Sequence, residues 1–127
     1  MRYKIHLPAK LYGDYKIGDG TTIGSFCDIG GKIGKNCKIQ CHVSIPPLTV
    51  IEDDVFLGPG VKIANDRQMD SNLKGTIIKK GAKIGMGALI GAGLTIGEKS
   101  IIGMGAVVLH DTFEGEVWAG NPAKLIQ

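Results

Sequence analysis

Three histidines, His6, His42 and His110, are the side chains of this chain best suited to acid–base chemistry near neutral pH. An imidazole can take the proton from an attacking amine or hydroxyl group. His42 stands three residues after Ile39, at a position where the chain is expected to turn, so its side chain should point outward. Histidine also tolerates the left-handed backbone of a turn. The sequence therefore leaves two roles open for His42, general base or turn residue, and favours surface roles for the other two.

The composition indicates one soluble domain, residues 1–127, and excludes several classes of function. A formal net charge of +3, without a block of Lys or Arg, is too small for a nucleic-acid-binding surface. The first residues, MRYKIHLPAK, are too polar for a signal peptide, and the apolar runs are too short to span a membrane. Three cysteines, an odd number, fit a reducing compartment. We therefore expect a cytoplasmic protein that binds neither nucleic acid nor membrane.

An aliphatic residue recurs every six positions along most of the chain, a period that belongs neither to a flat strand nor to a helix. In the segment IGMGALIGAGLTIGEKSIIGMGAVV (84–108) these residues are Ile84, Ile90, Ile96, Ile102 and Val108. A small or β-branched residue stands two positions before most of them and shares a strand face with them. Three positions after many of them stands Gly, Asn or Asp, residues that tolerate positive φ. Each hexad therefore predicts one short strand followed by one turn.

A turn every six residues, always in the same sense, winds the chain into a triangular prism. The hexads run over about 17–63 and 78–108 and predict about five coils of three hexads each, stacked about 4.8 Å apart by parallel strand pairing. Cys27 and Cys37 occupy small inward positions, so we expect buried hydrophobic residues rather than reactive thiols. The predicted fold is all-β, a parallel β-helix that buries one aliphatic side chain per hexad.

Two irregularities interrupt the period. The step from Ile29 to Ile33 is four residues, so one edge of the first coils is shortened by two. The step from Ile63 to Ile78 is 15 residues, and the surplus, about 64–75, is polar and must leave the prism as a loop. A rigid scaffold that carries one long loop commonly places function there. A tolerated insertion is the alternative interpretation.

Two further stretches resemble one particular family, the hexapeptide-repeat acyltransferases with a left-handed β-helix. The segment IEDDVFLGPGVKIAND (51–66) is similar to the branch that acetylates amino groups on nucleotide-linked sugars. The segment VWAGNPAKLI, within the tail 109–127, resembles the closing segment of these enzymes. The resemblance covers nearly the whole chain. It alone implies the left hand of the helix, because the usual rule for parallel crossovers predicts the opposite hand.

The resemblance also implies an activity, a co-substrate and an assembly. The activity is N-acetylation of an amino sugar, linked to a nucleotide, with acetyl-CoA as the acyl donor and no metal. The assembly is a homotrimer of parallel prisms, with acetyl-CoA in a groove between two subunits. An open prism face exposes apolar area that association would cover, which gives a physical reason for a trimer. The acceptor sugar, transfer to nitrogen or oxygen, and the acyl length stay open.

Three residues are assigned to the co-substrate by this resemblance. Met86 and Met104 fall on turns whose backbone contacts pantetheine in the family. Lys124 falls where a basic residue meets the CoA phosphates, and a cationic partner is chemically reasonable there. A solvated lysine in the tail is the alternative interpretation of Lys124.

Three residues at the start of the loop are assigned to the acceptor. Asn65 and Asp66 resemble the Asn-Asp pair that faces the sugar in this branch, and Arg67 could bind a phosphate of the sugar nucleotide with two hydrogen bonds. Family members continue with a Tyr-Pro-like pair, where this chain has Gln68 and Met69. We therefore expect an altered sugar pocket.

Two other functions compete with this prediction. The first is a zinc enzyme of the carbonic-anhydrase type, which shares the fold but needs three imidazoles on one ion. His6, His42 and His110 lack the spacing for such a site, and the hexads contain one histidine. The second is a non-catalytic assembly module. The tail and the loop argue against that module, whereas the missing Tyr-Pro-like pair argues for it, and the fold alone cannot decide.

Overall fold

The computed structural model describes residues 2–127, and between them the chain forms nineteen short strands and no helix. Each strand except one has two residues, as expected when a hexad spends its other four residues on a turn. Sheet A contains β1 (Lys4–Ile5), β4 (Thr22–Ile23), β7 (Lys38–Ile39), β10 (Phe56–Leu57), β13 (Lys83–Ile84), β16 (Ile101–Ile102), β18 (Val117–Ala119) and β19 (Lys124–Leu125). Sheet B contains β2 (Lys10–Leu11), β5 (Asp28–Ile29), β8 (Ser44–Ile45), β11 (Lys62–Ile63), β14 (Leu89–Ile90) and β17 (Val107–Val108). Sheet C contains β3 (Lys16–Ile17), β6 (Lys32–Ile33), β9 (Val50–Ile51), β12 (Ile77–Ile78) and β15 (Thr95–Ile96).

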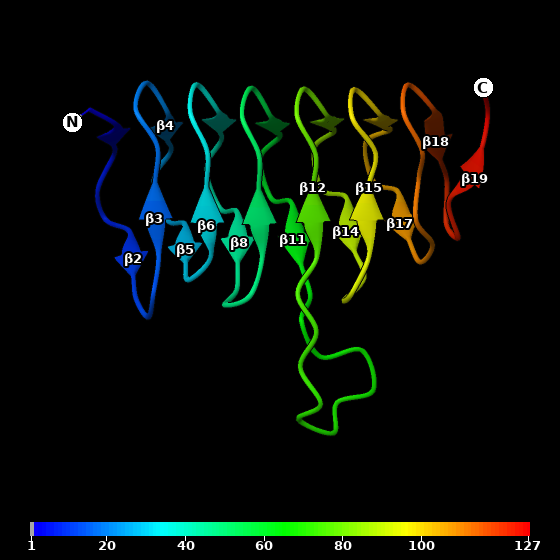
Figure 1. Cartoon of the computed structure of the whole chain (residues 1–127), viewed down its shortest axis with the longest axis horizontal. Coiled ribbons are helices and arrows are strands. Elements are labelled where there is room, and N and C mark those ends of the chain that lie inside the picture. Colours follow the sequence, from blue (N-terminus) through cyan, green and yellow to red (C-terminus); the bar gives the residue numbers. More distant parts are fainter. Residues whose placement is uncertain (1) are drawn as a thin grey trace.

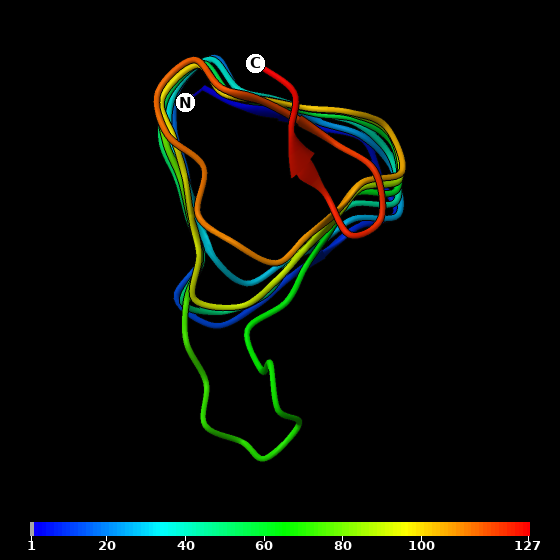
Figure 2. The same ribbon diagram turned by 90° about the vertical axis from the view of Figure 1, so that its right-hand side faces the viewer.

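From β1 to β18 consecutive strands belong to different sheets, so the chain winds as a triangular solenoid whose three walls are built of parallel strands (Figure 1). Sheet C rises along the near face in Figure 1, and the chain then crosses the top to the far face while it advances toward the C-terminus. This sense of winding is left-handed, as the resemblance implied. Seen along its axis, the backbone outlines a triangle from which one long loop projects (Figure 2).

The solenoid has about six turns, one more than the sequence analysis predicted. The additional turn comes from the first seventeen residues, where Ile5, Leu11 and Ile17 also stand six positions apart. The turns after Ile5 and Leu11 contain Pro8 and Gly13 among polar residues and lack the pattern of the later hexads. The six-residue period is therefore less conspicuous in this part of the sequence. β18 begins a further turn, and β19 folds back onto it as an antiparallel partner.

Strand register confirms both interruptions of the period. Lys4 pairs with Thr22, eighteen residues on, whereas Lys16 pairs with Lys32, sixteen residues on, so the shortened edge lies between β5 and β6. Val50 pairs with Ile77, twenty-seven residues on, which is nine more than the regular coil. The surplus leaves the prism as a loop between β11 and β12, as expected.

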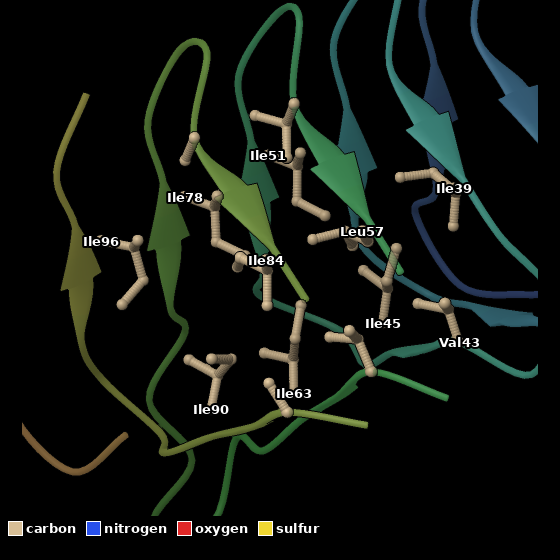
Figure 3. Packing of buried hydrophobic residues seen from close by; sticks show 14 of the residues in the cluster. Ile39, Val43, Ile45, Ile51, Leu57, Ile63, Ile78, Ile84, Ile90 and Ile96 are labelled. Atoms are coloured by element: carbon tan, nitrogen blue, oxygen red, sulfur yellow. The ribbon is translucent and has the colours of Figure 1, made fainter. Parts of the chain in front are cut away.

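Aliphatic side chains form one core cluster along the prism, and Figure 3 shows its middle part, from Ile39 to Ile96. From β4 to β17 the second residue of every strand is buried, while the first residue of the same strand points outward. Cys27 and Cys37 are buried among them, and each S–H donates to a backbone carbonyl 3.1 Å away. Burial raises the pKa of both thiols, which confirms that they are small core residues. No helix that could span a lipid bilayer occurs between Arg2 and Gln127.

Adjacent isoleucines of β12 provide a matched test of this core. Ile78 is fully buried and Ile77 is 38% exposed on the outer face. Ile78→Ala should lower the free energy of unfolding by roughly 2–5 kcal/mol, because neighbouring coils cannot collapse onto the cavity. Ile77→Ala should cost about 0.5 kcal/mol or less. Chemical denaturation of both variants measures the difference, and equal losses would contradict the assignment of inward and outward positions.

Candidate functional site

The turns stack into three corners that run the length of the prism (Figure 2). The first corner joins each strand of sheet A to the next strand of sheet B. The second corner joins sheet B to sheet C and carries the loop, and the third joins sheet C back to sheet A. At all three corners the residue three positions after an inward aliphatic has positive φ, including His42 at 60°. The turns predicted from Gly, Asn and Asp are therefore confirmed.

The first corner brings His42, Met86 and Met104 into one column, although they come from separate hexads. Backbone hydrogen bonds connect each turn of this column to the turn below it. The N–H groups of His42, Gly60, Gly87 and Gly105 donate to the carbonyls of Ser25, Cys41, Pro59 and Met86 at 2.8–3.0 Å. The sequence-predicted base and pantetheine contacts thus lie along one edge.

Backbone is accessible along the C-terminal half of this column. A Cβ atom on Gly87 or Gly105 would meet nothing within 4 Å, so both turns face open space. Met86 and Met104 are 61% and 80% exposed beside them, and their backbone N–H groups have no hydrogen-bond partner within residues 2–127. A ligand with amide carbonyls could therefore bind along this edge through the main chain.

His42 lies near the N-terminal end of the same column. Its ring stacks on the ring of Phe26, with 5.1 Å between centroids and 23° between planes. The ammonium group of Lys62 donates to the His42 carbonyl at 2.6 Å. No side chain between residues 2 and 127 is hydrogen-bonded to the imidazole, so no carboxylate orients it within one chain. The ring is held by its stacking on Phe26.

The three loop residues assigned to the acceptor lie at the second corner, and each makes an internal contact. The Asn65 amide donates to the Pro47 carbonyl at 3.0 Å, and the Asn65 carbonyl accepts from the Lys74 N–H at 2.8 Å. Arg67 donates to the Leu109 carbonyl at 3.2 Å. These bonds close the neck of the loop and tie it to two coils.

Asp66 organises the loop from inside. One carboxylate oxygen accepts the Asp70 N–H at 3.1 Å and the other accepts the Ser71 N–H at 3.0 Å. The carboxylate therefore satisfies two backbone donors that no strand could pair. Asp66 positions neighbouring residues through these two bonds, a role that the sequence analysis did not foresee.

A polar hollow of about 270 Å³ lies between this loop and the coil on its C-terminal side. Arg67 and Lys74 place two cationic side chains on its lining, and Lys74 lies against the turn at Gly93. Asp70 contributes the only carboxylate of the lining. The excess of positive charge suits an anionic group.

Two threonines at the second corner differ in their hydrogen bonds. The Thr76 hydroxyl donates to the Gly91 carbonyl one coil further on and accepts the Leu94 N–H. Thr49 occupies the equivalent position one coil earlier, where the chain departs into the loop. Its hydroxyl is buried and, among the atoms of residues 2–127, lacks a partner. The insertion thus carries a stability cost beside the site.

Lys124 lies in β19, at the C-terminal end of the first corner. The tail reaches this place because the Val107 N–H donates to the Gly120 carbonyl at 3.0 Å and the Ala123 N–H donates to the Val107 carbonyl at 2.8 Å. Lys124 is exposed there. The co-substrate candidates thus share the first corner and its end, whereas Asn65, Asp66 and Arg67 lie at the second corner.

No three His, Cys, Asp or Glu side chains within residues 2–127 are grouped so that they could hold a metal ion. His6 and His42 belong to turns of the first corner, while His110 follows β17 at the second corner. The three imidazoles of one chain therefore do not form a zinc site.

Sequence reasoning missed Phe26 and Lys62 as members of the site. Phe26 has φ 64° and is 59% exposed, at a turn position where Gly, Asn or Asp stands in most hexads. An aromatic residue at such a position is a signal that could have been read from the hexad alignment. Lys62 gave no signal, because it is an ordinary outward residue of β11 and its contact with His42 spans twenty residues.

The carboxylate of Asp66 should control the order of the loop. Asp66→Ala removes the acceptor of two backbone N–H groups, so the loop should exchange amide hydrogens at least tenfold faster at 70–72 and be cleaved sooner by protease. Asp28→Ala, which removes an exposed carboxylate from β5, is the matched control. Unchanged exchange in the Asp66 variant would show that the loop is held by other contacts.

Comparison with known proteins adds family and structural relatives. Models of the bacterial transferase hexapeptide (six repeats) and of the hexapeptide repeat of succinyl-transferase match residues 75–110 and 15–45. Delta-poly-L-ornithine synthetase of Acinetobacter baumannii (strain AB307-0294) is 30% identical over 103 residues, which are 77% of this chain and 8% of that protein. The chain therefore matches only a small part of that relative.

Solved structures share the whole solenoid. Perosamine N-acetyltransferase of Caulobacter crescentus, a mutant bound to CoA and GDP-perosamine, superposes with a TM-score of 0.89 at 24% identity over 100% of this chain and 57% of its own. WeeI of Acinetobacter baumannii AYE gives 0.82 at 30% identity, over 93% of this chain and 55% of its own. A mutant of AntD, an N-acyltransferase of Bacillus cereus bound to dTDP and coenzyme A, gives 0.90 at 20% identity, over 98% and 79%.

The chain spans little more than half the length of the first two structures. At identities of 20–24% the likeness shows a common fold, and the repeat models cover both halves of the solenoid. Hexapeptide repeats of the kind that bacterial transferases contain therefore occupy both halves of the solenoid.

Proposed function

We propose that this protein transfers an acetyl group from acetyl-CoA to the amino group of a nucleotide-linked sugar. The observation that carries the proposal is the first corner, where free backbone N–H groups line an open edge between an exposed cation and an imidazole. Similar proteins of known structure were crystallised with CoA together with GDP-perosamine or dTDP, which supports both substrates.

The donor would lie along the first corner. Its pantetheine arm carries amide groups that can accept hydrogen bonds from the N–H groups of Met86 and Met104. The glycine turns between them let the arm approach the backbone closely. Lys124 at the C-terminal end would meet the CoA phosphates.

The acceptor would lie against the loop at the second corner. Arg67 and Lys74 would bind the diphosphate of the sugar nucleotide in the polar hollow. Asn65 would face the sugar from the neck of the loop, and Asp66 would hold the loop in shape through its two backbone contacts.

The site would form between subunits of a homotrimer. Within one chain the two groups of residues lie on different corners, so one active site requires the first corner of one subunit beside the second corner of another. Exposed apolar side chains on sheet C, Val50 and Ile77, give association a driving force. Three free cysteines fit the reducing cytoplasm.

The chemistry needs little from the protein. The neutral amine attacks the thioester carbonyl, a backbone N–H stabilises the oxyanion, and the carbon–sulfur bond breaks to release CoA thiolate. The ammonium of the intermediate loses its proton to His42, which returns it to the thiolate. When His42 serves only as a turn residue, the thiolate takes the proton directly.

A non-catalytic assembly module is the second candidate. It is favoured by the internal hydrogen bonds of Asn65, Asp66 and Arg67, which explain these residues without a ligand. A thiol-release assay with acetyl-CoA and a panel of nucleotide-linked amino sugars separates the two candidates. Transfer to an amine of the panel supports the enzyme, and CoA binding without release for any acceptor supports the module.

Lys124 tests the placement of the CoA phosphates. Lys124→Ala should weaken CoA binding about tenfold in calorimetry, with a smaller loss at high salt because the phosphates are then screened. Pantetheine, which lacks the nucleotide, should bind both forms equally. Lys16→Ala, at the opposite end of the solenoid, is the control and should bind CoA like the wild type. Equal losses for CoA and pantetheine would make Lys124 a structural residue.

His42 tests the proton transfer. His42→Asn keeps a residue that tolerates φ of 60° and removes the proton acceptor. Thermal stability should hardly change, while turnover should fall about a hundredfold or more. The pH profile should also lose the acidic limb that a titrating imidazole produces. An unchanged rate in this variant would exclude His42 as the base and leave catalysis to positioning of a neutral amine.

A further inference from the structure

The first corner changes character along its length. The same turn position is occupied, from the N-terminal side, by Phe26, His42, Gly60, Gly87 and Gly105, with φ of 64°, 60°, 76°, 73° and 68°. Because the backbone is alike at all five places, a side chain at one of them projects as it would at the others. The column is therefore bare backbone over three coils and is closed by two rings over the next two.

The two rings stand where glycine would fit without strain. A bulky L-residue at positive φ is unfavourable, and Phe26 is the plainest case because phenylalanine has no polar group that favours this conformation. The ring of Phe26 is also 59% exposed, so core burial does not explain its presence. Its stacking on His42 makes the pair one continuous obstacle. Leu48 and Lys99 also have positive φ at other corners, so the feature that indicates a role in the site is the stack of two exposed rings at the end of the open column.

The two ends of the column differ in chemistry. The C-terminal end carries the tail and the exposed Lys124, which suit phosphate groups. The N-terminal end carries the stacked rings and the Lys62 ammonium, which is already bound to the His42 carbonyl. Strands stack about 4.8 Å apart, so the open turns from Gly105 to Gly60 extend over roughly 10 Å before the rings begin.

We propose that the Phe26–His42 stack is a stop that restricts the acyl group of the donor to a short chain. This inference rests on the proposed function, because it takes the column as the path of the pantetheine arm, with the thioester at its N-terminal end. An acetyl group ends against the rings. A longer acyl chain would have to continue over the turns that the rings occupy.

Glycine substitutions test the stop, because they introduce the residue that the next three coils carry at the same φ. Calorimetry on the full chain measures the Kd of acetyl-CoA and of hexanoyl-CoA for wild type, Phe26→Gly, His42→Gly and the double variant. The ratio of the hexanoyl-CoA Kd to the acetyl-CoA Kd should fall at least tenfold in the double variant and less in each single one. Lys99→Gly, which removes an exposed side chain at φ of 59° from the third corner, is the matched control and should leave the ratio unchanged.

The reverse substitution tests the same claim in a chain that keeps both rings. Gly60→His extends the obstacle by one coil, where a Cβ atom would meet only Gly87 atoms at 3.9 Å or beyond. It should weaken acetyl-CoA binding at least tenfold and CoA binding less. If the double glycine variant fails to fold, acetyl-CoA binding by Gly60→His still tests the stop.

Three results would overturn the stop. One is an unchanged Kd ratio in glycine variants that still bind CoA. Another is weaker binding of 3′,5′-ADP to Phe26→Gly, which would show that the rings hold the adenine instead. The third is normal acetyl-CoA binding by Gly60→His. These results leave acetyl transfer by the wild type intact, whereas a wild type that binds no CoA contradicts the proposed function together with the stop.

Discussion

Stacking of one aliphatic side chain per hexad on its equivalent in the next coil is the interaction on which the whole structure depends. Each two-residue strand is too short to be stable alone, so it persists only because parallel neighbours pair with it and its inward side chain is buried. The positive-φ residue at each turn keeps the coils in phase, because it returns the chain to the same corner. A rigid prism with three straight edges follows from these two requirements.

Functional residues can therefore lie only at positions that the repeat does not need for strand pairing or burial. The walls and the core are committed to pairing and burial, so variation is tolerated at the corners and where the period fails. The first corner offers backbone donors and two rings, and the second offers a loop that the scaffold accommodates at the cost of the unpartnered Thr49 hydroxyl. The loop keeps its shape through Asp66, not through strands. The separation of these two corners within a chain is the geometric reason for the proposal that the site is shared between subunits.

The fold could be predicted from the sequence because the six-residue period and its two interruptions are local features. The strand register follows from the number of residues between successive inward aliphatic positions. The structure confirms the shortened edge after Ile29 and the loop before Ile78. The first turn was missed because Ile5 and Leu11 lack the glycine-rich context of the later hexads. The site was predictable only in part. The grouping of residues at corners requires the three-hexad coil, and the contacts of Phe26, Lys62 and Asp66 join residues whose pairing no local pattern reveals.

Hybrid assemblies provide the most direct test of a site built from two chains. Asn65→Ala impairs the second corner and Lys124→Ala impairs the first, so each homogeneous protein should transfer acetyl groups slowly at low CoA concentration. Co-expression of the two variants places them in one assembly, where some interfaces combine an intact first corner with an intact second corner. The account predicts that the purified hybrid recovers a substantial part of wild-type turnover, well above the mean of the two variants. Turnover equal to that mean would contradict a site shared between subunits.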